Sequence, residues 1–181
     1  MDGLPDVIGQ TSSLQENVVK EVAINQGDGE FEKEKISFTF TSPDGSSPSF
    51  NNPVDINNDG YVEYITERHV FTNEMTGTSQ GFSLDLGNYE IISIAQYAIA
   101  DFDRDGRIDL YAIVKDADGN NQPVIIYNEG NNKGSVVELP SGIDTRDNWK
   151  AYDVDGDGYM DLVYIESAWN KYKILRNLGG R

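Results

Sequence analysis

Short runs of β-branched and aromatic residues alternate with polar loops along the whole chain of 181 residues. Runs of this kind, bounded by Gly, Asn and Asp, predict β-strands, and no apolar repeat of about 3.6 residues predicts a helix longer than a turn or two. The clearest runs are NVVKEVAIN (17–25), KISFTF (35–40), YVEYI (61–65), IDLYAIV (108–114) and MDLVYI (160–165). The pattern therefore predicts an all-β fold built from short strands.

Three acidic loops lead into three of these runs. Oxygen-bearing side chains stand at places one, three, five and nine of each loop, and a glycine stands at place six, where it permits a backbone bend that other residues resist. The loops begin 46 and 52 residues apart. The three sets are Asp55, Asn57, Asp59 and Glu63; Asp101, Asp103, Asp105 and Asp109; and Asp153, Asp155, Asp157 and Asp161. Three copies in one register indicate a built site rather than a solvated acidic turn.

Crowded carboxylates in a tight loop predict a bound dication. Side chains at alternate places can turn toward one centre, where their like charges repel. A cation converts this repulsion into attraction, and hard oxygen ligands suit Ca²⁺, which takes roughly six to eight of them. The EF-hand is the rival, but it needs a glutamate at place twelve, where this chain has Thr66, Ala112 and Tyr164. We therefore expect place nine to close each loop, with about three Ca²⁺ ions bound in β-hairpins.

A second repeated signal, an Asn-Gly turn, follows the acidic loops. Its copies are NQGDGEF (25–31), YNEGNNKG (127–134) and RNLGG (176–180), and DLGNY (85–89) is a diverged copy. The segment DGLPDVIG (2–9) reads as the later part of a further acidic loop. Each unit thus has four short strands in about 50 residues, near the length of a propeller blade.

The order of acidic loop and turn resembles that of FG-GAP/VCBS repeats, which build the integrin α-subunit β-propeller. The family pattern, D-x-D-x-D-G-x-x-D-L followed by N-x-G-x-G, covers nearly the whole chain. The resemblance implies that Ca²⁺ is bound through places one, three, five and nine and through the backbone carbonyl of place seven. It therefore adds Tyr61, Arg107 and Tyr159 to the expected metal ligands. Such propellers usually have seven blades, whereas this chain holds about three and a half.

One domain, a partial β-propeller, is expected over residues 1–181. Its predicted blades span approximately 1–48, without a first strand; 49–94; 95–140; and 147–181, without a last strand. An open stack leaves unpaired strand edges, which invite association. The remaining blades are therefore expected from a longer parent chain or from another copy. The parent chain is the favoured explanation, because the sequence starts within an acidic loop.

Charge and composition narrow the classes of partner. The chain carries 31 Asp and Glu against 14 Lys and Arg, a formal net charge of −17. This surface argues against nucleic acid and against docking to an anionic membrane, because both need clustered cations. Cysteine is absent, which excludes disulfides and thiolate metal sites. No signal peptide is visible. Oxygen-rich sites that work at roughly 10⁻⁴–10⁻³ M Ca²⁺ favour an extracellular or cell-surface location.

The chain is expected to bind rather than to catalyse. Its one histidine, His69, falls in a predicted strand, and the chain lacks a nucleophile elbow, a P-loop and a dinucleotide fingerprint. The predicted function is a calcium-stabilised binding or adhesion module of a secreted or cell-surface protein, with a protein or carbohydrate ligand. The alternative is a propeller, catalytic or not, of a polysaccharide-active lyase or dehydratase or of a toxin complex.

Three aromatic residues are weak candidates for contact with that ligand, on the face opposite the calcium loops. Tyr97 and Trp149 stand four residues before an acidic loop, where an inner strand would begin near the mouth of a central channel. Trp169 falls in a short loop expected on the same face. Such rings can stack on sugars or anchor a partner's side chain. Packing between blades is the other interpretation of Tyr97 and Trp149.

Overall fold

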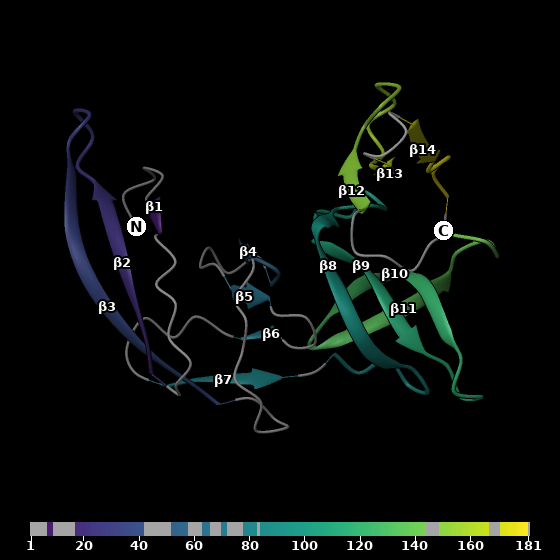
Figure 1. Ribbon diagram of the computed structural model, residues 1–181, viewed down its shortest axis with the longest axis horizontal. Coiled ribbons are helices and arrows are strands. Elements are labelled where there is room, and N and C mark those ends of the chain that lie inside the picture. The colour runs from purple at the N-terminus through teal and green to yellow at the C-terminus, as the bar shows by residue number, and fades with distance from the viewer. Residues whose placement is uncertain are drawn as a thin grey trace.

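The computed structural model describes residues 7–8, 17–41, 52–57, 63–65, 70–71, 78–82, 84–143, 149–166 and 171–180. Within these ranges the chain forms fourteen β-strands and no helix, which confirms the predicted all-β fold. The same ranges accordingly hold no helix that is long and apolar enough to cross a membrane. The strands make three sheets of seven, four and three strands (Figure 1).

The first sheet joins two groups of strands that the sequence predicts as separate blades. Its strands are β1 (Val7–Ile8), β2 (Asn17–Asn25), β3 (Phe31–Thr41), β4 (Asn52–Val54), β5 (Glu63–Ile65), β6 (Val70–Phe71) and β7 (Thr78–Phe82). Their order is β1-β2-β3-β7-β6-β5-β4. Only β3 and β7 pair in parallel, with Thr39 opposite Thr78. This pairing gives the outermost strands of both groups partners for backbone groups that an edge would leave open.

The second and third sheets are antiparallel meanders. The second contains β8 (Glu90–Ala100), β9 (Asp109–Lys115), β10 (Asn121–Gly130) and β11 (Lys133–Glu138), in the order β11-β10-β9-β8. The third contains β12 (Trp149–Tyr152), β13 (Asp161–Glu166) and β14 (Lys171–Leu175), in that order. One acidic loop joins β8 to β9 and another joins β12 to β13, so both connect antiparallel neighbours.

Strand β8 begins before the predicted blade boundary at residue 95. The sequence pattern assigns residues 90–94 to the preceding blade, but Ile91 pairs with Val114 of β9. Ile94 is buried in the core of the same sheet, which explains why this apolar segment joins β9. The sheets that the structure describes do not close into a ring, so the number of blades stays a prediction.

Two apolar clusters hold the sheets together, and β9 contributes to both because successive side chains of a strand point to opposite faces. The cluster between the first and second sheets, the first seam, contains Ile56, Ile65, Val70, Leu84, Leu86, Ile94, Leu110, Ala112, Val114, Val124 and Ile126. The cluster between the second and third sheets, the second seam, contains Ala95, Ala98, Phe102, Tyr111, Ile113, Ile125, Trp149, Leu162 and Tyr164. The sheets are therefore packed through their faces.

Candidate metal centres

Two acidic loops each gather three carboxylates around one point. In each group the carboxylate oxygen atoms lie within 4.8 Å of one another, and the three residues come from places one, three and nine of the loop. The groups are Asp101, Asp103 and Asp109 in the β8–β9 loop, and Asp153, Asp155 and Asp161 in the β12–β13 loop. In both groups the carboxylate at place nine is buried. The structure thus brings together three of the four side chains predicted for each loop.

Backbone N–H groups curl each loop around its first aspartate. The N–H groups of Asp105 and Gly106 donate to the Asp101 carboxylate at 3.1 and 2.9 Å. In the next loop the N–H of Gly158 donates to the Asp153 carboxylate at 3.0 Å. Gly106 and Gly158, both at place six, have φ angles of 87° and 89°, which L side chains rarely adopt. The bend therefore requires the glycine that the motif places there.

The carboxylate at place nine ties the start of its loop to the following Asn-Gly turn. Asp109 is 0% exposed, and its two oxygens accept hydrogen bonds from the N–H groups of Phe102 and Asn128, both at 2.8 Å. Asp161 is also 0% exposed and accepts the two equivalent bonds at 3.1 and 2.8 Å. Each oxygen has a second lone pair, so these bonds leave coordination capacity for a cation.

Burial raises the pKa of Asp109 to about 6. The N–H donors from Asn128 and Phe102 pull this pKa down, and the negative charges of Asp103 and Asp105 push it up. Burial dominates because taking a carboxylate out of water disfavours its charged form. A dication beside Asp109 would favour the charged form, so the electrostatics of the loop suit a cation.

The aspartate at place five belongs to neither three-carboxylate group. Asp105 forms an ion pair with the side chain of Arg107, whose Nε donates to the carbonyl of Asn128 at 2.5 Å. Asp157 accepts a hydrogen bond from the N–H of Tyr159 at 2.8 Å. Coordination by place five, and by the carbonyls of Arg107 and Tyr159 at place seven, stays a prediction.

The β4–β5 loop is described in part, and Asp59 and Tyr61 lie outside the described residues. At place nine, Glu63 is 1% exposed and accepts a hydrogen bond from the N–H of Ile56 at 3.0 Å. The same bond is made by Asp109 and Asp161 in the other loops. The glutamate therefore takes the structural position of the aspartate, with its longer side chain.

The donor atoms of both complete groups fit calcium. Ca²⁺ takes roughly six to eight oxygens at about 2.3–2.6 Å, and it accepts carboxylates, carbonyls and water together. The two groups offer carboxylate oxygens only, and their mutual repulsion is relieved by a bound cation. The first ion would be held by Asp101, Asp103 and Asp109, and the second by Asp153, Asp155 and Asp161. Each ion would supply positive charge at the base of a hairpin.

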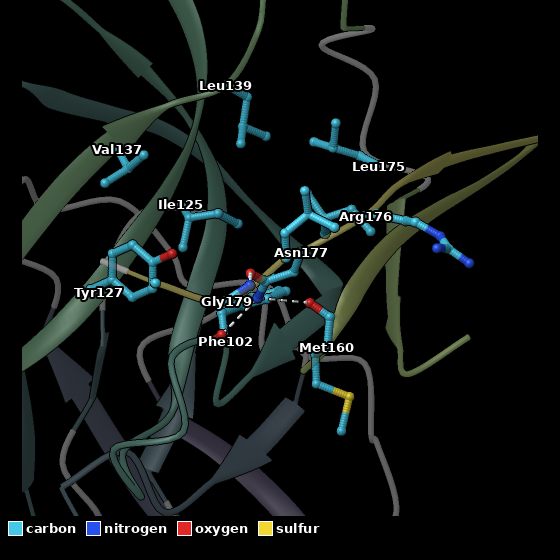
Figure 2. A pocket seen from close by; sticks show the side chains of 13 residues that line it. Phe102, Ile125, Tyr127, Val137, Leu139, Met160, Leu175, Arg176, Asn177 and Gly179 are labelled. Atoms are coloured by element: carbon cyan, nitrogen blue, oxygen red, sulfur yellow. Dashed lines mark hydrogen bonds between the residues drawn. The ribbon is translucent and has the colours of Figure 1, made fainter. Parts of the chain in front are cut away.

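In two Asn-Gly turns, the asparagine connects its turn to the acidic loop of the preceding sheet. The turn motif in the sequence did not reveal this role. The Nδ2 atom of Asn128 donates to the carbonyl of Ile56 at 2.6 Å, across the first seam. The Nδ2 atom of Asn177 donates to the carbonyl of Phe102 at 2.7 Å, across the second seam (Figure 2). Both carbonyls belong to place two of a loop. The signal in the sequence that could have pointed to this role is the asparagine of N-x-G. Its Oδ1 accepts the N–H of the glycine two residues later, at 2.9 Å for Asn128 and 3.2 Å for Asn177.

A cavity of about 300 Å³ lies beside the second of these links. Figure 2 shows side chains of β10 and β11 on one side, among them Ile125 and Val137, and Leu175 of β14 on the other. Its lining is mostly apolar and contains no carboxylate of either metal group. The cavity therefore belongs to the packing of the seam and not to the metal centres.

Of the three aromatic candidates for ligand contact, the structure describes the side chain of one, Trp149. Trp149 is 2% exposed, and its ring lies 6.1 Å from that of Tyr111 and 5.5 Å from that of Tyr164, measured between centroids. This position supports the other interpretation of Trp149, packing between blades, because the ring is enclosed by apolar contacts at the second seam. Tyr97 lies in β8, with its side chain outside the description, and Trp169 and His69 lie outside the described residues.

Comparison with known proteins gives one match. The family model of the FG-GAP-like repeat matches residues 101–164, from the first aspartate of one complete metal loop to the strand that follows the other. No curated protein and no solved structure matches the chain. The matched range contains both three-carboxylate groups and the predicted spacing between them, so this part of the chain is similar to an FG-GAP-like repeat.

Proposed function

We propose that this chain is a calcium-stabilised binding module, in which ions in the acidic loops hold the repeats together and a partner binds elsewhere on the molecule. The carrying observation is the pair of three-carboxylate groups, each built around a buried aspartate within the matched repeat segment. Like charges at this density destabilise a metal-free fold, so a bound dication has a direct structural benefit.

The ions are proposed to be structural and not catalytic. Each place-nine carboxylate already fixes two backbone N–H groups, so a cation on it would stiffen the hairpin and the turn together. This arrangement supports binding as the function, with the partner, a protein or carbohydrate, on the face opposite the loops. A secreted or cell-surface protein is the proposed setting, because calcium is abundant there.

Calcium should raise the stability of the chain, because an ion that binds only the folded state shifts the folding equilibrium by mass action. The expected gain is about 2.7 kcal/mol per site at a hundredfold excess over the dissociation constant. Titration calorimetry should detect at least two binding events, and the melting temperature should be higher in calcium than in chelator. Magnesium should be the weaker ligand, since it demands near-octahedral geometry and keeps its waters.

The replacement Asp153→Asn should abolish one binding event and leave the other. Asp118→Asn is the matched control, because Asp118 is an exposed aspartate in the β9–β10 turn, outside both groups. Identical melting curves in calcium and chelator, together with a flat calorimetric titration, would show that the loops are acidic turns.

A further inference from the structure

A chain of three hydrogen bonds runs from one three-carboxylate group to the other. An oxygen of Asp109 accepts the N–H of Phe102 at 2.8 Å. The carbonyl of Phe102 accepts the side-chain amide of Asn177 at 2.7 Å (Figure 2). The backbone N–H of Asn177 donates to an oxygen of Asp161 at 2.8 Å. Because Asp109 and Asp161 are the buried place-nine residues of the two groups, Phe102 and Asn177 connect the two proposed metal centres.

The same chain of bonds is present at the first seam, one repeat earlier. Glu63 accepts the N–H of Ile56 at 3.0 Å, and the carbonyl of Ile56 accepts the side-chain amide of Asn128 at 2.6 Å. The backbone N–H of Asn128 then donates to the other oxygen of Asp109 at 2.8 Å. The arrangement thus recurs with the same role at each position, which makes it a feature of the repeat and not of one loop.

A second contact between the two acidic loops lies beside these bonds. Arg104, at place four of the β8–β9 loop, has a φ of 64°, which L residues rarely adopt. Its guanidinium carbon lies 5.1 Å from the centroid of the Tyr159 ring in the β12–β13 loop, a cation–π distance. A Cβ at Gly179 would lie 2.7 Å from atoms of the same ring, so Tyr159 also packs against the turn that contains Asn177. The two loops and this turn therefore form a closed set of contacts.

The turn at residues 176–180 is the element that both loops hold. These five residues belong to no strand, and the loops fix the turn through the backbone and the side chain of Asn177. A cation that stiffens either loop therefore also favours the docked turn. Ordering that the first ion brings about lowers the entropic cost of binding the second. The contacts thus favour tighter binding of the second ion.

Charge alone predicts the opposite effect. Two bound dications repel each other, and a filled β8–β9 loop is more positive than an empty one by two charges. Repulsion through space would therefore weaken the binding of an ion to the β12–β13 loop. The sign of the interaction between the two sites consequently distinguishes coupling through the contacts from coupling through charge.

We propose that the β8–β9 and β12–β13 loops bind calcium cooperatively, each ion raising the calcium affinity of the other loop through Asn177 and Arg104. The inference rests on the proposed function, because it concerns the same two groups of carboxylates. Coupling between two equilibrium affinities is reciprocal, so both loops should gain by the same factor. Couplings of this kind usually change affinity by about 5- to 150-fold.

A calcium titration of the whole chain, followed by ¹⁵N nuclear magnetic resonance, tests the proposal. Gly106 and Gly158 stand at place six, and their N–H groups donate to the first aspartate of their own loops, so their signals report the two sites separately. Asp103→Asn and Asp155→Asn each remove the ligand at place three. Asp103→Asn should weaken calcium binding at Gly158 by about fivefold or more, and Asp155→Asn should weaken binding at Gly106 by the same factor.

Two further variants test the residues that carry the coupling. Asn177→Ala keeps the backbone N–H that binds Asp161 and removes the side-chain amide, and Arg104→Gln removes the cation above the Tyr159 ring. In a chain with both changes, the effect of Asp103→Asn on binding at Gly158 should fall toward none. Arg104→Lys retains a cation and should retain the factor. Asn128→Ala is the matched control, because it removes the same amide at the first seam and should leave the factor unchanged.

The outcomes separate the coupling from calcium binding itself. Asp103→Asn removes one negative charge together with an ion of two positive charges, so charge alone predicts tighter binding at Gly158. Equal or tighter binding there, in a variant whose dispersed spectrum shows it to be folded, would overturn the coupling and leave calcium binding intact. A factor that survives the loss of both Asn177 and Arg104 would overturn their role. Signals of Gly106 and Gly158 that ignore calcium in the wild-type chain would overturn the proposed function, and the coupling with it.

Discussion

The aspartate at place nine combines an observed backbone role with the metal role that we propose for it. Asp109 has no exposed surface, and it holds the N–H of Phe102 at the start of its loop and the N–H of Asn128 in the turn. An asparagine in its place would offer one acceptor oxygen instead of two. Its NH2 group would face one of the two backbone N–H groups, which cannot accept a hydrogen bond. The residue should therefore matter even when calcium is absent.

Asp109→Asn should lower the free energy of unfolding by about 1–3 kcal/mol in chelator, the usual range when a buried hydrogen-bonding group loses its partner. Urea unfolding measures this difference, and a calcium titration of the same variant should lose one binding event. The control is Asp118→Asn, which changes an exposed side chain and should alter stability by less than about 0.5 kcal/mol. Equal unfolding midpoints for the two variants would contradict the backbone role.

At the scale of elements, the described sheets are joined by apolar seams and by a side-chain amide that crosses each seam. Asn128 is 6% exposed, and its side chain spans from its own turn to the carbonyl of Ile56 in the preceding sheet. Its oxygen meanwhile closes the turn on Gly130. The asparagine thus couples turn geometry to sheet packing, which an aspartate cannot do because it lacks the donor.

Asn128→Asp should destabilise the fold by about 1–3 kcal/mol, because the carbonyl of Ile56 loses its buried donor and gains a negative neighbour. The midpoint of thermal or urea unfolding reports the effect. Asn131→Asp is the matched control in the same turn, where the residue is exposed and already has a φ of 52°, a conformation that aspartate also tolerates. The structural role of the Asn128 amide would be contradicted if Asn131→Asp lowered the unfolding midpoint as much as Asn128→Asp.

Local pattern predicted the strands and loops well, because β-strand composition and a fixed nine-residue spacing are properties of contiguous sequence. The glycine at place six and the strands β9 and β13 that follow the acidic loops were both predicted from that pattern. Two features lay beyond it. The parallel pairing of β3 with β7 depends on which edges meet in space. The amide of Asn177 reaches a carbonyl 75 residues away, so no local motif names its partner.

The chain carries a net charge of −17, and in the part that the structure describes its sheets contact one another through two apolar seams. Trp149 is the largest side chain of the second seam, where it contacts the rings of Tyr111 and Tyr164. Its burial makes it a support for the attachment of the third sheet to the second.

Trp149→Ala should destabilise the fold by about 3–5 kcal/mol, the cost typical of removing a large aromatic side chain from a core. Chemical unfolding followed by circular dichroism measures the loss. Tyr152→Ala in the same strand is the control, because Tyr152 is 53% exposed and does not belong to the second seam. A small effect at Trp149 would instead favour the ligand-stacking role that its burial argues against.

The two asparagine side chains donate to carbonyls far back in the sequence, and this separation matters while the chain is being synthesised. Ile56 leaves the ribosome 72 residues before Asn128, the donor that caps its carbonyl. At about 5–20 residues per second, that interval is roughly 4–14 s. During it, an acidic loop is present without the neighbour that fixes it, and the same delay recurs between Phe102 and Asn177. Two acidic loops are thus completed only by a later repeat, so during each interval the nascent chain holds a loop carbonyl that still lacks its amide donor.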